Sequence, residues 1–361
     1  MKHKGSKKRI AIIAVNILLT AAALCCLLLM YLLPKKLISQ QEAERWQGES
    51  EQAYAQTTVL SPRDEKMSIS DVYSTRTKLM EKMHKAALDV NNDAELLIDA
   101  WSTNGKVSVY SGYGSGNVSA LAVGGSYFDF HPITLLSGSY IGEHDLMKDR
   151  VLLDEEVAWL LYGGTDLQGM SLSINNKNFY VAGVIRREED FADKRAYSDG
   201  MGLYMSYDAY SELFPEAGIT CYEVVMPQPV KNFARTAMEE LFKGKDKAII
   251  DNTSRFGLPA LLRVAGNFAE RSIQDNGIEY PYWENAARYV EYYCAELLLF
   301  AMILLVMPLV SVVIVLVRLC RKGHEELTEN LLPKAKDDVE EFIRVRGRRR
   351  WERRQGRHEK K

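Results

Sequence analysis

Residues 149–185 read DRVLLDEEVAWLLYGGTDLQGMSLSINNKNFYVAGVI, and this stretch carries the clearest fold information in the chain. RVLLD has the composition of a short strand, and EEVAWLLYG predicts one or two helical turns that end at Gly163. MSLSI and FYVAGVI alternate in polarity around the polar turn NNKN, which predicts two paired strands. The expected unit is therefore strand, helix and hairpin.

The acidic run Asp154-Glu155-Glu156 stands where this helix begins. Aspartate is a favoured N-cap residue, and acidic side chains in the first turn lie at the positive end of the helix dipole. Paired catalytic acids usually converge in a pocket rather than follow one another in sequence. We therefore predict that Asp154 caps the helix and that the run is not a catalytic pair.

Two uncharged runs are long enough to cross a membrane. Residues 10–33 form 24 positions without a charge, and residues 297–317 form a second run of 21. At about 1.5 Å per residue, the first spans roughly 36 Å as a helix. It is also longer than the apolar part of a usual signal peptide, and no small-x-small cleavage site follows it. We predict two transmembrane helices, the first an uncleaved anchor.

Charge predicts the orientation of these helices. Residues 1–9 carry five Lys/Arg and no acid, and residues 318–361 carry fifteen Lys/Arg against nine Asp/Glu. By the positive-inside rule, both termini are expected in the cytoplasm. The rest of the chain holds 26 basic and 39 acidic residues. The sequence thus predicts a two-pass protein of the cell membrane whose acidic domain, residues 34–296, is extracytoplasmic.

The extracytoplasmic domain shows the same order of elements twice. AYAQTTVLS, SISDVYSTRTKLMEKMHKAAL and AELLIDAW predict strand, helix and strand, and so do CYEVVMPQP, VKNFARTAMEELFK and KAIIDNTSR. Two β-α-β units separated by a β-rich insertion, about residues 106–207, predict a split α+β fold.

The segments next to the membrane runs are polar and helix-forming. Residues 35–53 and the lead-in YWENAARYVEYY predict stalk helices that continue the two spans outward. Trp283 and the tyrosines after it fit an interfacial aromatic belt.

The pattern of residues 149–185 resembles the MacB-like periplasmic core domain, the external module of FtsX-like permeases in the mechanotransmission (type VII) class of ABC transporters. The shared features are the helix start, a helical alanine, an aromatic-Gly pair, an Asp, a Gly and a closing Val-x-Gly-Val strand. The matching positions are Asp154, Ala158, Gly163, Asp166, Gly169, Val181, Gly183 and Val184. The sequence departs from the pattern at the turn positions Leu167, Gln168 and Met170.

The resemblance covers the external domain and both flanking helices. FtsX-like permeases normally carry four membrane helices, so this chain, with two runs, resembles a shortened form. The resemblance implies a permease-like subunit that works with a separate ABC ATPase, either alone or together with a fuller FtsX-like permease. Pairing of two chains, as a homodimer or a heterodimer, is left open.

Motifs that would indicate catalysis or metal binding are missing from the sequence. It contains no G-x-x-x-x-G-K-[ST], H-E-x-x-H or C-x-x-C. We therefore expect no cofactor, no bound metal and no nucleic-acid partner.

Two further features could have a function. Pro308 interrupts the second span, either as a hinge or as a tolerated kink. The basic tail RVRGRRRWERRQGRHEKK is expected to contact anionic lipid or a partner protein. Its arginines in this prediction are Arg344, Arg346, Arg348, Arg349, Arg350, Arg353 and Arg354.

Three functions are compatible with these sequence features. The first is a non-catalytic permease-like subunit that couples a cytoplasmic ATPase to the external domain. The second is a membrane-anchored receptor or sensor that binds a peptide, a lipid or a cell-wall component. The third, an ectoenzyme, lacks a recognisable nucleophile and base, so we expect the protein not to be an enzyme.

Overall fold

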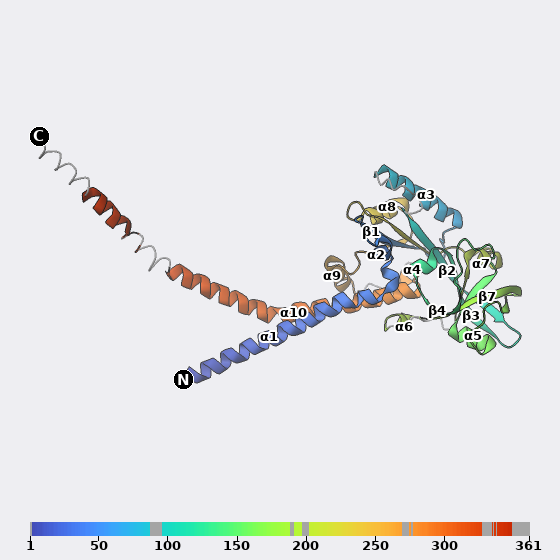
Figure 1. Cartoon of the computed structure of the whole chain (residues 1–361), viewed down its shortest axis with the longest axis horizontal. Coiled ribbons are helices and arrows are strands. Elements are labelled where there is room, and N and C mark those ends of the chain that lie inside the picture. Colours follow the sequence, from blue (N-terminus) through green and yellow to red (C-terminus); the bar gives the residue numbers. More distant parts are fainter. Residues whose placement is uncertain are drawn as a thin grey trace. The chain divides into compact units, whose positions relative to one another are not determined.

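The computed structural model describes residues 2–86, 96–187, 191–196, 202–268, 274–275, 277–326, 334, 336 and 338–348. The chain forms two units (Figure 1). One unit comprises Leu27–Leu299, and the other combines Met1–Cys26 with Phe300–Lys361. We describe each by itself.

Two interlocked β-α-β units form one half of the sheet in the larger unit. Their elements are β1 (Tyr54–Leu60), α3 (Ile69–Lys85), β2 (Ile98–Tyr110), β9 (Cys221–Pro227), α8 (Phe233–Leu241) and β10 (Ala248–Asp251). The strand order is β10-β1-β9-β2, and each neighbouring pair is antiparallel. A strand of each β-α-β unit therefore lies between the two strands of the other β-α-β unit. The predicted split α+β fold is confirmed.

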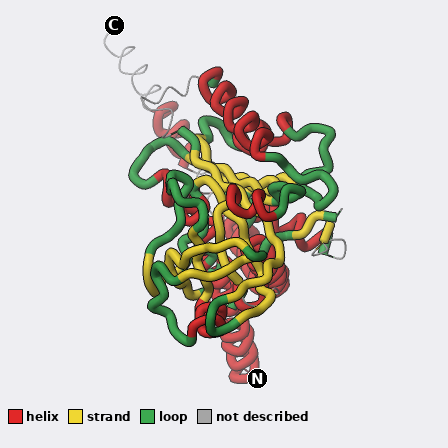
Figure 2. Tube along the Cα trace, turned by 90° about the vertical axis from the view of Figure 1, so that its right-hand side faces the viewer, coloured by secondary structure: helices red, strands yellow, loops and turns green. Residues whose placement is uncertain are grey.

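The elements between β2 and β9 extend the same sheet. Figure 2 shows the strands of the domain in yellow and its helices in red. They are β3 (Ser115–Gly125), α4 (Tyr127–Phe130), β4 (Thr134–Gly138), β5 (Arg150–Asp154), α5 (Glu155–Tyr162), β6 (Ser171–Ile174), β7 (Lys177–Arg186), α6 (Asp193–Ala196), β8 (Gly202–Ser206) and α7 (Tyr207–Leu213). The order continues β2-β3-β8-β5-β7-β4, and β6 pairs with β2 and β7. The expected start of the insertion, near residue 106, lies inside β2 because this long strand pairs with both β9 and β3.

Both faces of the sheet are covered. On one face, α3 buries Val72, Leu79 and Met83 in the larger hydrophobic cluster, which also contains residues of α5, α7 and α8. Helix α3 begins with a capping box between Ser68 and Asp71, which satisfies backbone N–H groups at its first turn. On the other face, a second cluster includes residues of α4 and the start of α10 (Tyr282–Glu326).

The predicted stalk after the first span is wrong. Helix α1 (Lys2–Leu32) ends before Pro34, whose ring removes a backbone donor that a continuing helix would use. The chain then folds against the domain in η1 (Pro34–Lys36), η2 (Ile38–Gln40) and α2 (Glu42–Gln47).

The segment before the second span is helical, as predicted, because α10 begins at Tyr282 and continues into the apolar run. Trp283, however, is only 2% exposed and packs in the second cluster, so its assignment to an interfacial belt is wrong. The remaining elements before α10 are α9 (Leu258–Gly266), β11 (Gln274–Asp275) and β12 (Ile278–Glu279).

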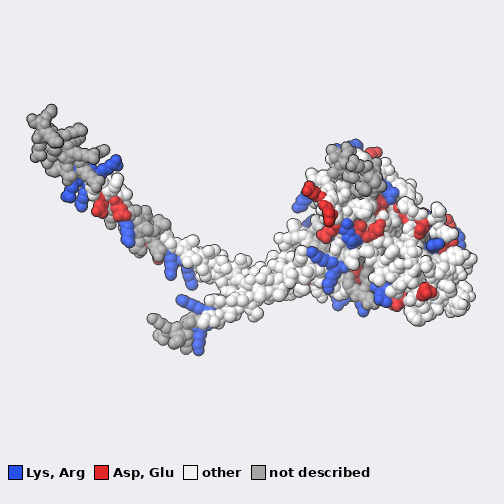
Figure 3. Space-filling model, in the orientation of Figure 1, with Lys and Arg blue, Asp and Glu red and all other residues white. Residues whose placement is uncertain are grey.

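The smaller unit contains the apolar parts of α1 and α10. Both helices are long and apolar enough to span a membrane, and these parts show almost no charged atoms in Figure 3. Within this unit, Asn16 Nδ2 donates a hydrogen bond of 2.9 Å to Ser311 Oγ. Helix α10 continues through Pro308. The hinge at Pro308 and the cytoplasmic position of the termini stay predictions.

Candidate functional site

The acidic run at the start of α5 divides into one buried and two surface residues. Asp154 is 1% exposed, and its Oδ1 accepts a hydrogen bond of 2.7 Å from the Val157 amide. This is the capping contact expected from the sequence. Asp154 Oδ2 accepts from the Gly202 amide and pairs with Arg187. Burial raises the pKa of Asp154, and the guanidinium of Arg187 opposes that rise. Of the three acids, Asp154 alone is therefore buried.

The other motif residues shape the β5-α5-β6-β7 segment. Ala158, Val181 and Val184 are buried in the core. Gly163 ends α5 in the left-handed conformation (φ 73°), and Gly169 also has a positive φ. Asp166 is exposed.

Gly183 allows two strands to approach closely. A Cβ at this position would lie 2.4 Å from the Ser137 carbonyl oxygen on β4. The motif residues therefore lie in one supersecondary unit, but they do not converge on one site. Their structural role stays a prediction.

The basic tail is only partly described. Arg344, Arg346 and Arg348 lie on an exposed helical segment, residues 338–348. Arg349, Arg350, Arg353 and Arg354 fall outside the described residues. Contact of these arginines with lipid or with a partner stays a prediction.

A buried ionic cluster joins three segments that are distant in sequence. We call it the Arg255 cluster; its members are Gln40, Arg255, Glu284 and Glu291. Arg255 Nη1 and Nη2 each donate at 2.8 Å to one carboxylate oxygen of Glu284. Arg255 Nε donates at 2.9 Å to Glu291, and Nη1 also donates at 2.8 Å to Gln40 Oε1. The side chains of Arg255, Glu284 and Glu291 are 3%, 2% and 6% exposed.

Helical geometry explains how α10 supplies both carboxylates. Glu284 and Glu291 are seven residues apart, about two helical turns, so they point to the same side of the helix. Arg255 lies between β10 and α9, and Gln40 follows the end of α1. Asn252 Nδ2 also donates to Gln40 Oε1 at 3.0 Å, and the amide nitrogen of Asn252 bonds to Gln56 on β1. The cluster thus connects the segment after α1, the start of α10 and the sheet. We call the place where these three parts meet the junction.

A second buried polar pair lies beside the first turn of α10. His131 Nε2 is 2.6 Å from Glu223 Oε2 on β9, and both side chains are 1% exposed. The imidazole ring lies between Tyr127 and Trp283, with ring centroids at 4.5 and 4.3 Å. Trp283 belongs to the first turn of α10, so this contact also links α10 to the sheet.

Glu42 on α2 gives this junction a pH dependence. The side chain pairs with Arg45, and Asp129 and His131 are also close enough to affect its charge. Burial raises the pKa of Glu42 to about 7, although Arg45 favours the ionised form. The pKa of Glu42 in the folded protein lies above its pKa in the unfolded chain. The stability that Glu42 contributes is therefore fully present below about pH 4.5 and is lost as the pH rises through about 7.

We expect the Glu42→Gln variant to remove this dependence. Between pH 5 and 8, the free energy of unfolding of the wild type should fall by about 2 kcal/mol more than that of the variant. Denaturant titrations of the full-length protein at several pH values would measure the difference. Glu44→Gln, which changes an exposed glutamate of the same helix, should follow the wild type. Parallel curves for wild type and Glu42→Gln would contradict the prediction.

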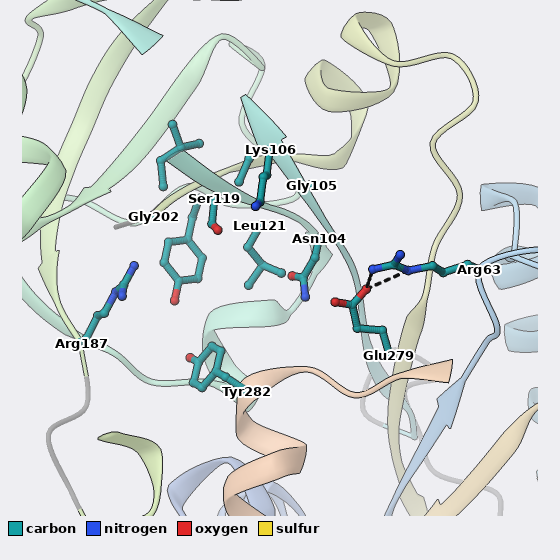
Figure 4. A pocket seen from close by; sticks show the side chains of 13 residues that line it. Arg63, Asn104, Gly105, Lys106, Ser119, Leu121, Arg187, Gly202, Glu279 and Tyr282 are labelled. Atoms are coloured by element: carbon teal, nitrogen blue, oxygen red, sulfur yellow. Dashed lines mark hydrogen bonds and ion pairs between the residues drawn. The ribbon is translucent and has the colours of Figure 1, made fainter. Parts of the chain in front are cut away.

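A cavity of about 300 Å³ is lined in part by the insertion (Figure 4). Its walls come from β2, β3 and β8, from the turn at Arg63, and from the segment of Glu279 and Tyr282 that leads into α10. Arg63 Nε pairs with Glu279 Oε2 at 2.9 Å at one end. Lys106 and Arg187 also line the cavity. The structure describes all eight motif residues, and none of them lines the cavity. Asp154, however, forms an ion pair with Arg187, which does line it.

Comparison with known proteins defines the class. The model of the MacB-like periplasmic core domain matches residues 49–239, and the chain belongs to this family. The resemblance read from residues 149–185 is thereby confirmed.

Among solved structures, the periplasmic region of MacB from Actinobacillus actinomycetemcomitans is 18% identical, with a TM-score of 0.41, over 55% of this chain and 90% of that one. The extracellular domain of the noncanonic ABC-type transporter YknZ from Gram-positive bacteria is 12% identical, with a TM-score of 0.39, over 55% and 98%. No curated protein matches the chain.

Sequence reasoning missed the Arg255 cluster. The sequence patterns predicted that Arg255 ends a strand and that Glu284 and Glu291 belong to a polar stalk helix. One signal was present, because two glutamates at a spacing of seven share a helix face that also carries Ala287 and Cys294. Nothing in the sequence indicates that Arg255 is their partner.

Proposed function

We propose that the chain is a non-catalytic, permease-like subunit that couples a separate cytoplasmic ABC ATPase to movement of its extracytoplasmic domain. The family supplies the transporter context. The observation that carries the proposal is the Arg255 cluster, which binds the sheet to the segments that lead into both candidate spans.

The physical reason is mechanical. A buried bidentate ion pair holds its partners in one geometry, and breaking it leaves an unpaired charge in the interior. Displacement of α10 or of the segment after α1 would therefore be passed to β10 and β1 rather than absorbed by a flexible linker. In this proposal the basic tail contacts anionic lipid or the ATPase on the cytoplasmic side.

Recovery of partners tests the proposal. The tagged full-length chain would be lightly crosslinked in its native membrane, purified in mild detergent and analysed by mass spectrometry. We expect an ABC-type ATPase, alone or with a fuller FtsX-like permease, and no ATPase with an unrelated tagged two-pass protein. Reproducible recovery of the chain without any ATPase would overturn the proposal.

Coupling is tested separately with the recovered complex. Hydrogen exchange of residues 250–299 would be compared with ATP and with a non-hydrolysable analogue. We expect exchange around Arg255 and the start of α10 to differ between the two nucleotides. Identical exchange would argue against transmission through this junction, even if an ATPase partner is found.

A second candidate function is a membrane-anchored receptor. The observation that favours it is the cavity beside α10, because a ligand there would contact Tyr282, the first residue of that helix. A receptor would bind its ligand without recovery of any ATPase, which distinguishes it from the first proposal.

A further inference from the structure

We propose that the cavity in Figure 4 binds a small organic anion. Its carboxylate or phosphate group would lie between Lys106 and Arg187, and its apolar part would lie against Leu121 and Tyr204. This inference does not rest on coupling to an ATPase, because it concerns only the extracytoplasmic domain.

The charges around the cavity favour an anion. Arg63 is neutralised by Glu279, and Arg187 is paired with Asp154. The side-chain ammonium of Lys106, on β2, has no hydrogen bond or ion pair within the described part of the chain. The lining residues therefore retain an uncompensated positive charge at Lys106, where an anionic group would form a charge-assisted hydrogen bond.

The second cation is held in position. Arg187 is bound by the carboxylate of Asp154, whose side chain is 1% exposed, whereas that of Arg187 is 22% exposed at the cavity. A Cβ at Gly202 would lie 2.9 Å from Arg187 Nη2, so glycine leaves room for the guanidinium. A charged group fixed in advance loses little conformational entropy when it binds a ligand.

Size and wall chemistry limit the ligand further. A volume of about 300 Å³ lies at the lower end of the range for small-molecule sites, so the cavity suits one small molecule. Leu121 and Tyr204 are 8% and 5% exposed and give the cavity an apolar wall. Figure 4 shows Asn104 and Lys106 extending from the same strand toward this space. The arrangement matches a molecule with one anionic end and one apolar or aromatic end.

Binding of four probes tests the proposal. Benzoate, phenyl phosphate, neutral benzamide and inorganic phosphate would be titrated into the full-length protein in detergent, with saturation-transfer NMR for the organic probes and calorimetry for all four. We expect at least one of benzoate and phenyl phosphate to bind roughly tenfold more tightly than benzamide, because the neutral amide oxygen accepts a weaker hydrogen bond from Lys106 than an ionised oxygen does. Which of the two binds better distinguishes a carboxylate ligand from a phosphate ligand.

Matched variants locate the site. Lys106→Gln should weaken binding of the preferred anion roughly tenfold, and Lys106→Arg should retain most of it. Lys78→Gln makes the same change at an exposed lysine on α3, which packs on the other face of the sheet, and should bind like the wild type. Circular dichroism would verify that each variant is folded.

Any one of the following results would overturn the proposal. One is binding of benzamide as tight as that of both organic anions, or no binding of either anion. Another is equal affinity of folded Lys106→Gln and Lys78→Gln. The last is inorganic phosphate bound as tightly as phenyl phosphate, because the apolar part of the proposed ligand would then contribute nothing to binding.

Discussion

Replacing Arg255 by methionine is expected to lower the free energy of unfolding by about 3–5 kcal/mol. The change leaves Glu284 and Glu291 buried without their cation, and Gln40 Oε1 loses one of its donors. An unpaired charge in the interior is costly because no water replaces the lost partner. Thermal unfolding of the full-length protein should show a midpoint about 10 °C lower.

Two comparisons make this result specific. Arg263→Met removes an exposed arginine on α9 and should change the free energy by less than about 0.5 kcal/mol. Adding Glu284→Gln and Glu291→Gln to Arg255→Met should recover part of the loss, because the uncompensated charges are gone. If Arg255→Met unfolds like Arg263→Met, the cluster does not stabilise the junction.

Replacing Asp154 by alanine is expected to lower the free energy of unfolding by about 3 kcal/mol. Loss of an N-cap usually costs about 1 kcal/mol, and the buried amide of Gly202 and the guanidinium of Arg187 also lose the Asp154 carboxylate as an acceptor. Asp154→Asn keeps an oxygen for the Val157 amide and should cost less. Denaturant titration of both variants measures the difference.

Glu156→Ala is the control, because Glu156 is an exposed neighbour in the same acidic run. It should unfold within about 0.5 kcal/mol of the wild type. A folded, fully stable Asp154→Ala variant that loses an activity of the domain would instead support catalysis, the alternative to the capping role predicted for this run.

Local patterns predicted much of the fold. The repeated strand-helix-strand order gave the split unit, because alternation and helical periodicity depend on neighbouring residues alone. Asp154 was found as a cap for the same reason. The prediction of a stalk helix after α1 was wrong. Residues 35–53 are polar enough for a solvent-exposed helix, but the chain turns at Pro34 and packs on the domain.

The candidate site was less predictable, since its contacts are distant in sequence. Gln40 and Arg255 are 215 residues apart, and Arg255 and Glu284 are 29 apart. Charged residues are usually exposed, so a single sequence gives no reason to bury all three ionic side chains together. Trp283 illustrates the same difficulty, because an aromatic residue near a span fits an interfacial belt as well as a domain core.

The position of β1 in the sheet has a consequence for how the protein is made. Residues 54–60 are synthesised early, but both neighbours of this strand, residues 221–227 and 248–251, come much later. At about 5–20 residues per second, β1 waits roughly 10 to 40 s for its second neighbour. During that time it is an unpaired strand with exposed backbone groups, a state that favours aggregation. A nascent chain that stops before residue 221 therefore cannot complete the split unit, and we expect such fragments to depend on chaperones or to be degraded.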